Sequence, residues 1–270
     1  MLAEEAMSDY STLLFDVRNN VAYITLNRPD AANALNAELA HDLMEVALRC
    51  EEDPTVRAVL IHANGKIFCA GGDLKSFAAQ PKEMLPTFLK KVTFHLHKAI
   101  SRFNRMKAPV VMAIHGAAGG AGMSLACAGD IVIAAESARF TMAYTRAGLT
   151  PDGSSTFFLP RIVGLRRAME LTLTNRVLSA REACDMGIVS RVVPDGELMA
   201  TAEGLAKGFA QGPTRAFLGV KRLFAESATR TLEDQMEQET EWIAEMGRTA
   251  DGPEGIASFL EKRPPKFRGE

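Results

Sequence analysis

Apolar and polar residues alternate in the first clear unit of the chain, which runs from residue 13 to residue 27 (LLFDVRNNVAYITLN). The alternation continues on both sides of Arg18-Asn19-Asn20, a pattern typical of a β-hairpin with its turn at these residues. Between residues 36 and 50, apolar side chains instead recur three or four positions apart, and this spacing predicts an α-helix.

Short apolar runs bounded by polar residues predict buried β-strands at 58–61, 110–114 and 131–134. A glycine turn and a helical stretch that ends near Met106 follow the first run. A glycine-rich turn and a helical run over 123–128 follow the second. This repeated order of strand, turn and helix indicates a layered α/β fold. The repeats share no residue motif, so they do not indicate a solenoid.

Residues 197–270 have a mostly helical pattern without a strand candidate, whereas strands and helices alternate in residues 1–196. We therefore expect the first part to be an α/β core that carries the functional site, and the second to be a helical subdomain. Within the second part, residues 233–246 carry an apolar stripe with two interpretations. The stripe docks on another subunit, or it packs on the chain's own core.

The charge balance gives no sign of a nucleic-acid or membrane partner. The 270 residues include 31 basic and 33 acidic side chains, which nearly cancel. No apolar run approaches the roughly 20 residues that a membrane-spanning helix needs. The N-terminal segment MLAEEAMSDY is acidic, whereas a secretory signal is basic and then apolar. We expect a cytoplasmic protein, with Met7 as an alternative natural start to Met1.

Cysteines and histidines give no sign of a metal site. Cys50, Cys69, Cys127 and Cys184 lie far apart without a CxxC pair, which excludes a zinc ribbon and a disulfide scaffold. The chain also lacks an HExxH motif, and we expect no bound metal.

Two glycine-rich turns are the main candidates for chemistry: residues 68–74 (FCAGGDL) and residues 115–122 (HGAAGGAG). Each leads into a predicted helix, where the first backbone N–H groups lack partners and carry a positive potential. Two such turns that meet would form an oxyanion hole for a carbonyl oxygen. Close packing of strands on helices is the alternative interpretation, because glycines serve it equally well. The second turn matches neither a Walker A loop nor a dinucleotide-binding fingerprint.

Further stretches join the two glycine turns in a recognisable series. They are residues 26–29, 33–36, 68–74, 109–130, 140–164, 183–189 and 254–256. In order and spacing this series resembles the crotonase family, the enoyl-CoA hydratase/isomerase group. The resemblance implies an α/β fold built as a crotonase-like spiral of ββα units with a C-terminal helical trimerisation region. It also implies an acyl-CoA thioester as substrate, no separate cofactor, and a homotrimer or dimer of trimers.

In this family two backbone N–H groups hold the thioester carbonyl, and by position these belong to Gly72 and Ala121. The family often has glycine at the second position, but alanine keeps the N–H group. By the same resemblance, Lys266 and Phe267 fall in a region that approaches the nucleotide of CoA, and residues 78–87 could line the acyl pocket. The remaining CoA contacts carry over to the backbone of Asn33, Ala34 and Leu35, and to Ala70, Asp73, Leu74 and Lys75 around the first turn.

The positions that hold two glutamates in the family's hydratases carry Ser124 and Tyr144 here. Neither is a carboxylate base near neutral pH, because tyrosine ionises near ~10 and serine has no accessible ionisation. Asp152 falls where the family's double-bond isomerases place their acid. One carboxylate is sufficient to remove a proton at one carbon and return it at another. The resemblance therefore implies an enoyl-CoA isomerase with Asp152 as proton carrier.

Three alternatives stay open. The first is hydration with a non-standard acid and base, in which Ser124 or Tyr144 holds the water. The second is dehalogenation, because His97 and Asp152 match the catalytic histidine and aspartate of the 4-chlorobenzoyl-CoA dehalogenase branch, although Tyr144 replaces that branch's tryptophan. His97 also fits a polar neighbour on a helix face. The third is a non-catalytic CoA- or RNA-binding homologue, and the lack of a basic tract with interleaved aromatics argues against RNA.

Overall fold

This computed structural model describes residues 10–270, so the alternative start at Met7 lies outside the described residues. Their centre is a six-stranded sheet in the order β1-β2-β3-β4-β6-β9. β1 and β2 pair antiparallel as the predicted hairpin, and the other neighbours pair parallel. The strands are Leu13–Arg18 (β1), Val21–Leu26 (β2), Ala58–Ala63 (β3), Val110–Ile114 (β4), Ile131–Ala135 (β6) and Arg191–Val193 (β9).

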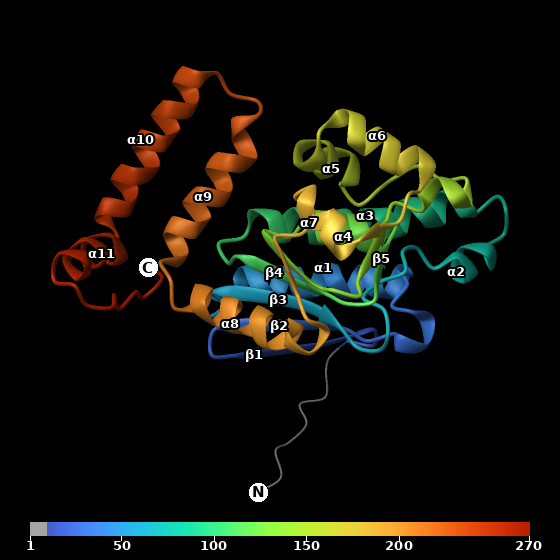
Figure 1. Cartoon of the computed structure of the whole chain (residues 1–270), viewed down its shortest axis with the longest axis horizontal. Coiled ribbons are helices and arrows are strands. Elements are labelled where there is room, and N and C mark those ends of the chain that lie inside the picture. Colours follow the sequence, from blue (N-terminus) through green and yellow to red (C-terminus); the bar gives the residue numbers. More distant parts are fainter. Residues whose placement is uncertain (1–9) are drawn as a thin grey trace, which may run out of the picture.

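Helices cover both faces of this sheet. The α-helices of the described residues are Ala37–Glu52 (α1), Leu74–Ala78 (α2), Leu85–Arg105 (α3), Ala121–Cys127 (α4), Ser155–Val163 (α5), Leu165–Thr174 (α6), Ala180–Asp185 (α7), Leu198–Ala210 (α8), Thr214–Ser227 (α9), Leu232–Arg248 (α10) and Asp251–Leu260 (α11). α1 and α3 pack together over one face, and α8 lies on the opposite face (Figure 1).

The long elements agree with the sequence pattern. α1 is the predicted helix at residues 36–50. Its N-cap, Asn36, accepts a hydrogen bond from the Leu39 amide at 2.9 Å. Leu39, Leu43 and Val46 are fully buried on its inner face, as their spacing predicts. The three predicted buried strands are β3, β4 and β6.

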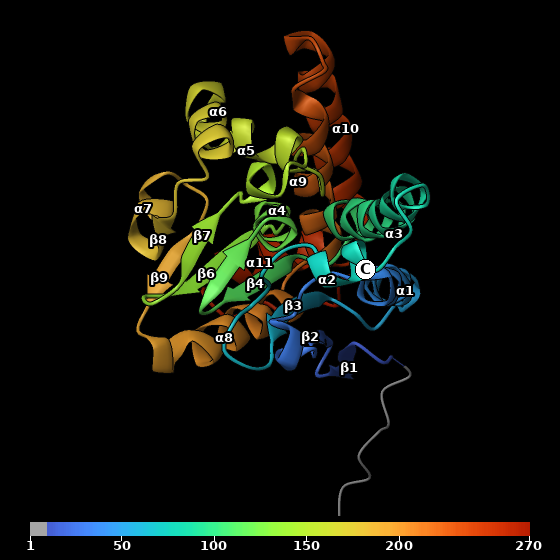
Figure 2. The ribbon, with the colours of Figure 1, turned by 90° about the vertical axis from the view of Figure 1, so that its right-hand side faces the viewer.

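A second sheet, in the order β5-β7-β8, stands beside the first (Figure 2). Its strands are Ala117–Gly119 (β5), Arg139–Thr141 (β7) and Leu178–Ser179 (β8). The chain passes from the first sheet to the second and then into a helix, as β4-β5-α4 and again as β6-β7-α5. This path is the expected spiral of ββα units. The sequence pattern did not predict β5, β7, β8 or β9, because two or three residues are too few to show a period.

The last three helices, α9 to α11, extend away from the sheets as a separate group (Figure 1). Lys221 ties α9 to the core through an ion pair with Asp130 at 2.6 Å, and its side chain is only 9% exposed. On α10, Trp242 packs against Gly219 of α9 while Ile243 stays exposed, so only part of the predicted apolar stripe has a partner within this chain. Among residues 10–270, every helix is too short or too polar to span a bilayer.

The expected boundary between residues 196 and 197 precedes α8. This helix buries Leu198 and Ala206 against the face of the sheet that carries Val21 and Leu60. By packing, α8 therefore belongs with the core. We propose that the division between the core and the C-terminal helices follows α8, near Gly212.

Candidate active site

A cavity of about 230 Å³ lies where the two glycine turns meet α2, α3 and the segment after β7. Its volume is small for a ligand pocket, and its wall is mostly apolar. Gly72, Ala121, Tyr144 and Asp152, four of the six residues predicted to take part in catalysis, line this one cavity. The other lining residues are Leu35, Ala70, Gly71, Leu74, Phe77, Leu89, Val92, Thr93, Gly120, Ala143, Ala147, Leu149 and Thr150.

The two glycine turns touch through their main chains. Cys69 pairs with Ala118 in an isolated parallel bridge, with hydrogen bonds from the Cys69 amide to the Ala117 carbonyl at 3.1 Å and from the Gly119 amide to the Cys69 carbonyl at 2.9 Å. A Cβ atom on Gly122 would lie 2.4 Å from the Cys69 carbonyl oxygen. Only glycine permits this approach. Close packing, one interpretation of the glycines, is therefore present.

The same packing leaves two amides directed away from the protein's own acceptors. Leu35 bonds to the peptide groups on both sides of Gly72: its amide donates to the Gly71 carbonyl at 2.7 Å, and its carbonyl accepts from the Asp73 amide at 2.9 Å. Ala121 is the first residue of α4, where an N–H group has no intrahelical acceptor. Among the hydrogen bonds of residues 10–270, neither the Gly72 nor the Ala121 amide has an acceptor. Both residues line the cavity, as an oxyanion hole requires.

The predicted carboxylate lies in a short chain of hydroxyl groups. The Tyr144 hydroxyl donates to Asp152 Oδ1 at 2.5 Å, and the Ser124 hydroxyl lies 2.8 Å from the Tyr144 oxygen. Ser124 is fully buried behind Tyr144 and does not line the cavity. Of these three residues, only Tyr144 and Asp152 border the cavity.

Burial is the main cause of a raised pKa at Tyr144, and the negative charge of Asp152 adds to it. The phenol therefore stays neutral at physiological pH and acts as a hydrogen-bond donor. A tyrosinate base is excluded, in agreement with the sequence analysis.

The loop that carries Asp152 is held in an unusual conformation. Gly153 and Ser154 both adopt a left-handed backbone, with φ of 57° and 64°. The Asp152 carbonyl accepts from the Ser155 hydroxyl at 2.8 Å, and the Gly153 amide donates to His97 Nε2 at 3.1 Å. His97 is exposed and does not line the cavity: it lies behind the loop, on a groove between α3, α5 and α9 that Asp152 also borders. The structure thus places His97 beside the backbone of the carboxylate loop and outside the lining of the cavity.

The residues predicted to contact CoA divide into two groups. Leu35, Ala70 and Leu74 line the cavity, and Lys75 is exposed on α2 next to it. Three others, Asn33, Ala34 and Asp73, take part in an internal hydrogen-bond network.

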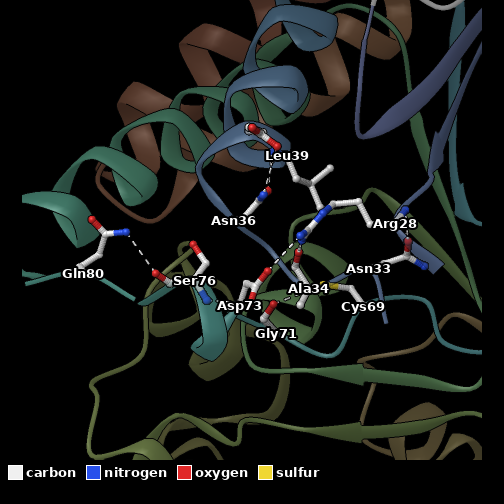
Figure 3. A network of polar contacts seen from close by, with 11 residues as sticks. Arg28, Asn33, Ala34, Asn36, Leu39, Cys69, Gly71, Asp73, Ser76 and Gln80 are labelled. Carbon is white, nitrogen blue, oxygen red and sulfur yellow. Dashed lines mark hydrogen bonds and ion pairs between the residues drawn. The ribbon is translucent and has the colours of Figure 1, made fainter. Parts of the chain in front are cut away.

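Figure 3 shows the part of this network around Arg28, Ala34 and Asp73. The fully buried Asn33 side chain donates to the carbonyls of Asn64 and Ile67, both at 2.8 Å. The Ala34 carbonyl accepts from Arg28, and the Asp73 carboxylate pairs with Arg28 at 3.0 Å. These groups shape the loops around the cavity.

Two expectations about the rim differ from the structure. Residues 78–87 do not line the cavity; Phe77 and Leu89, which flank that segment, do. This wall of the cavity is thus the inner face of α3, whose apolar spacing could have identified Leu89 and Val92. Phe267 packs on Gly255 of α11, at the opposite end of the molecule from α2 (Figure 1).

Comparison with known proteins gives the class. Residues 16–270 match the family model described as enoyl-CoA hydratase/isomerase. The chain belongs to the enoyl-CoA hydratase/isomerase family, whose members are enzymes with the fold described above. Within residues 10–270, no group of three or more His, Cys, Asp or Glu side chains is arranged to hold a metal ion.

Named relatives span more than one reaction. A protein of Escherichia coli (strain K12) named "1,2-epoxyphenylacetyl-CoA isomerase" is 39% identical, over 96% of this chain and 98% of that protein. A Rhodobacter capsulatus protein named "Probable enoyl-CoA hydratase" is 40% identical, over 96% and 99%. The solved structure of an enoyl-CoA hydratase from Polaromonas sp. JS666 superposes with a TM-score of 0.89 at 32% identity, over 96% and 100%.

The raised pKa of Tyr144 predicts a pH dependence of stability. In the unfolded chain this phenol ionises near ~10, whereas the folded protein holds its proton to higher pH. Above pH ~10 the folded state therefore binds more protons than the unfolded state, and the free energy of unfolding falls as pH rises, by at most about 1.4 kcal/mol per pH unit. The contribution of the neutral phenol to the free energy of unfolding is fully present below pH ~10. Tyr144→Phe has no ionisable group at this position and therefore lacks this pH dependence.

Urea unfolding of the wild type and of Tyr144→Phe, measured at intervals from pH 8 to pH 11, checks this expectation. The difference in stability between the two proteins should be constant at the lower pH values and should shrink at the higher ones. A constant difference throughout would show that Tyr144 ionises equally in both states.

Proposed function

We propose that this protein is an isomerase of acyl-CoA thioesters, which shifts the double bond of an enoyl-CoA through a thioester enolate. One observation carries the proposal: a single carboxylate, Asp152, shares a mostly apolar cavity with two backbone amides that lack acceptors, those of Gly72 and Ala121. The name of the Escherichia coli relative supports isomerisation, and that of the Rhodobacter capsulatus relative supports hydration. The choice therefore depends on the side chains of this site.

The two amides supply the electrostatic part of the reaction. When a proton leaves the α or γ carbon of an enoyl thioester, negative charge moves onto the carbonyl oxygen. Donors already aimed at that oxygen stabilise the charge without reorganisation, and one such donor contributes roughly 10²- to 10³-fold in rate. Gly72 and Ala121 hold these positions through the loops described above, so no side chain need move.

Asp152 supplies the proton transfer. Tyr144 donates to its Oδ1, and Ser124 in turn can donate to the Tyr144 oxygen, so that a chain of neutral donors holds the carboxylate in one orientation. The second oxygen, Oδ2, then takes a proton from one carbon of the substrate and returns it to the carbon two bonds away. The acyl chain would lie against Leu89 and Val92 of α3.

A homotrimer or dimer of trimers is part of the proposal. Large apolar side chains on the C-terminal helices remain exposed in the single chain, and burying them would be favourable. They are Val220, Phe224, Leu232, Met236, Ile243, Ile256, Phe259 and Leu260.

Asp152→Asn tests the reaction. The amide keeps the shape of the side chain but cannot accept the substrate proton, so isomerisation of a 3-enoyl-CoA should fall by at least about 10²-fold. Ser124→Ala is the matched control, because it removes a more distant hydroxyl of the same chain and should cost less than about tenfold. Double-bond shift and water addition are followed separately, with 3-enoyl-CoA and 2-enoyl-CoA.

The outcomes separate the rival functions. An Asp152→Asn rate within about twofold of wild type would remove Asp152 as proton carrier. Water addition without a double-bond shift would identify a hydratase. Binding of CoA thioesters without turnover of any of them would identify a binding protein.

Ala121→Pro tests the oxyanion hole. Proline is tolerated at the first position of a helix, where its missing N–H has no intrahelical partner. This change therefore removes one donor from the cavity, and isomerisation should fall about 10²- to 10³-fold. Ala121→Gly keeps the donor and should stay within a few-fold of wild type. Circular dichroism checks that both variants fold, and equal rates in the two would contradict the proposed role.

The oligomer is tested on the C-terminal helices. Sedimentation equilibrium of the wild type should give the mass of three chains or six. Replacing Phe224 and Ile243 with glutamate places charge on the exposed apolar face and should shift the mass toward that of one chain. A wild-type mass of one chain at micromolar concentration would overturn this part of the proposal.

A further inference from the structure

Arg28 is a partly buried charged residue that the proposed reaction does not use. It follows β2, and its side chain is 19% exposed. One guanidinium nitrogen donates to the Ala34 carbonyl, and the other donates to the Asp73 carboxylate at 3.0 Å (Figure 3). Arg28 thus connects two separate segments, residues 33–35 and residues 70–73.

These two segments are the ones that orient the Gly72 amide. As described above, both peptide groups that flank Gly72 bond to Leu35. The Ala34 carbonyl that Arg28 holds is in the peptide group that also contains the Leu35 amide, and Asp73 is the residue next to Gly72. Because glycine has an unusually free backbone, the direction of the Gly72 N–H depends on how firmly these neighbours are held.

Arg28 is itself firmly anchored. The Arg28 backbone amide donates to the Asn33 side-chain oxygen at 2.7 Å, and the Asn33 backbone amide donates to the Arg28 carbonyl at 2.9 Å. The Asn33 side chain also donates to the carbonyls of Asn64 and Ile67. The guanidinium therefore extends from a base that is tied to the loop after β3.

Asp73 connects this network to the wall of the cavity. Its other carboxylate oxygen caps α2 by accepting from the Ser76 amide at 3.1 Å. Burial alone would raise the pKa of Asp73, but the Ser76 amide and Arg28 outweigh it, so its pKa lies below the ordinary value and the ion pair is charged at neutral pH. α2 carries Phe77, and its ring packs closely on Gly72: a Cβ atom added to Gly72 would lie 2.9 Å from the ring. The network thus holds Gly72 from both sides.

We propose that Arg28 is a positioning residue for the oxyanion hole: its planar fork fixes residues 33–35 against residues 70–73 and so aims the Gly72 N–H at the thioester carbonyl. This inference rests on the proposed function. Lysine keeps the charge but is a single point donor and cannot hold two acceptors in the fixed geometry of a guanidinium. Arg28→Lys should therefore impair the aim of the amide while leaving the surroundings charged.

The test measures carbonyl polarisation directly. Butanoyl-CoA labelled with ¹³C at the thioester carbonyl is saturated and has no double bond to shift. Hydrogen bonds to its oxygen should move the ¹³C resonance downfield when it binds the wild type. Arg28→Lys should lose a large part of that shift at saturating ligand. With an enoyl-CoA, kcat should fall about tenfold or more while KM changes less than about threefold, because the lost interaction acts mainly in the transition state.

A matched control exists on the surface. Arg102 pairs with Glu51 on neighbouring helices away from the cavity, so Arg102→Lys should leave both the ¹³C shift and kcat unchanged. Asp73→Asn is the second variant: asparagine caps a helix as well as aspartate, so α2 should persist, while the ion pair to Arg28 is lost. It should show a reduced shift in the same direction as Arg28→Lys. Thermal melting of each variant monitors folding.

Failure of this inference is distinct from failure of the proposed function. If the wild type polarises the carbonyl and Arg28→Lys and Asp73→Asn do so equally, Arg28 does not position the amide, although the oxyanion hole stands. If the wild type itself gives no shift on binding, the oxyanion hole and the proposed function fail. Should Arg28→Lys not fold, an unchanged shift in Asp73→Asn still overturns the inference.

Discussion

The contact between the two glycine turns is the constraint on which the site depends. A Cβ atom on Gly119 would lie 2.9 Å from the Ala70 carbonyl, and one on Gly122 only 2.4 Å from that of Cys69, so main chain must meet main chain here. A side chain at either glycine would force the turns apart, at a typical cost of about 1–3 kcal/mol for overpacking. It would also separate the Gly72 and Ala121 amides. The close packing that glycines allow and the paired donors are therefore two consequences of one arrangement, rather than rival interpretations.

The spiral explains why the parts of the site come together. Its successive turns end at the same side of the parallel sheet, and each contributes one part: Gly72 follows β3, Ala121 follows β4 and β5, and Tyr144 and Asp152 follow β6 and β7. Ligands of open α/β sheets commonly bind beyond the carboxyl ends of the strands, where loops from neighbouring strands meet. In this chain the bridge from Cys69 to Ala118, a residue of the short second sheet, directly joins the segments that carry Gly72 and Ala121. It thereby narrows the space beyond the strand ends.

The sequence predicts the parts of this molecule that have a period or a motif. The hairpin, α1, three buried strands and both glycine turns are of this kind, and four of the six predicted catalytic residues line one cavity. It does not predict contacts between side chains that are remote in sequence: Ser124 lies behind Tyr144, and His97 meets the Gly153 amide, only because α3, α4 and the loop after β7 pack together. Nor does a helical pattern tell a core helix such as α8 from the C-terminal helices, since both have apolar faces.

The division of labour between backbone and side chains bears on which reaction the site supports. A main-chain donor survives substitution, so alanine at residue 121 keeps the N–H that glycine would supply. Side chains carry no such tolerance: with a serine at residue 124 and a neutral tyrosine at residue 144, Asp152 is the one carboxylate left in this hydrogen-bonded group. Adding water across a double bond requires a group that deprotonates the water and a proton donor for the α carbon. Moving the double bond needs a single proton carrier, because the proton that leaves one carbon is the one that arrives at the other. One carboxylate at the end of a chain of two neutral hydroxyls therefore supports the proposed isomerisation better than hydration.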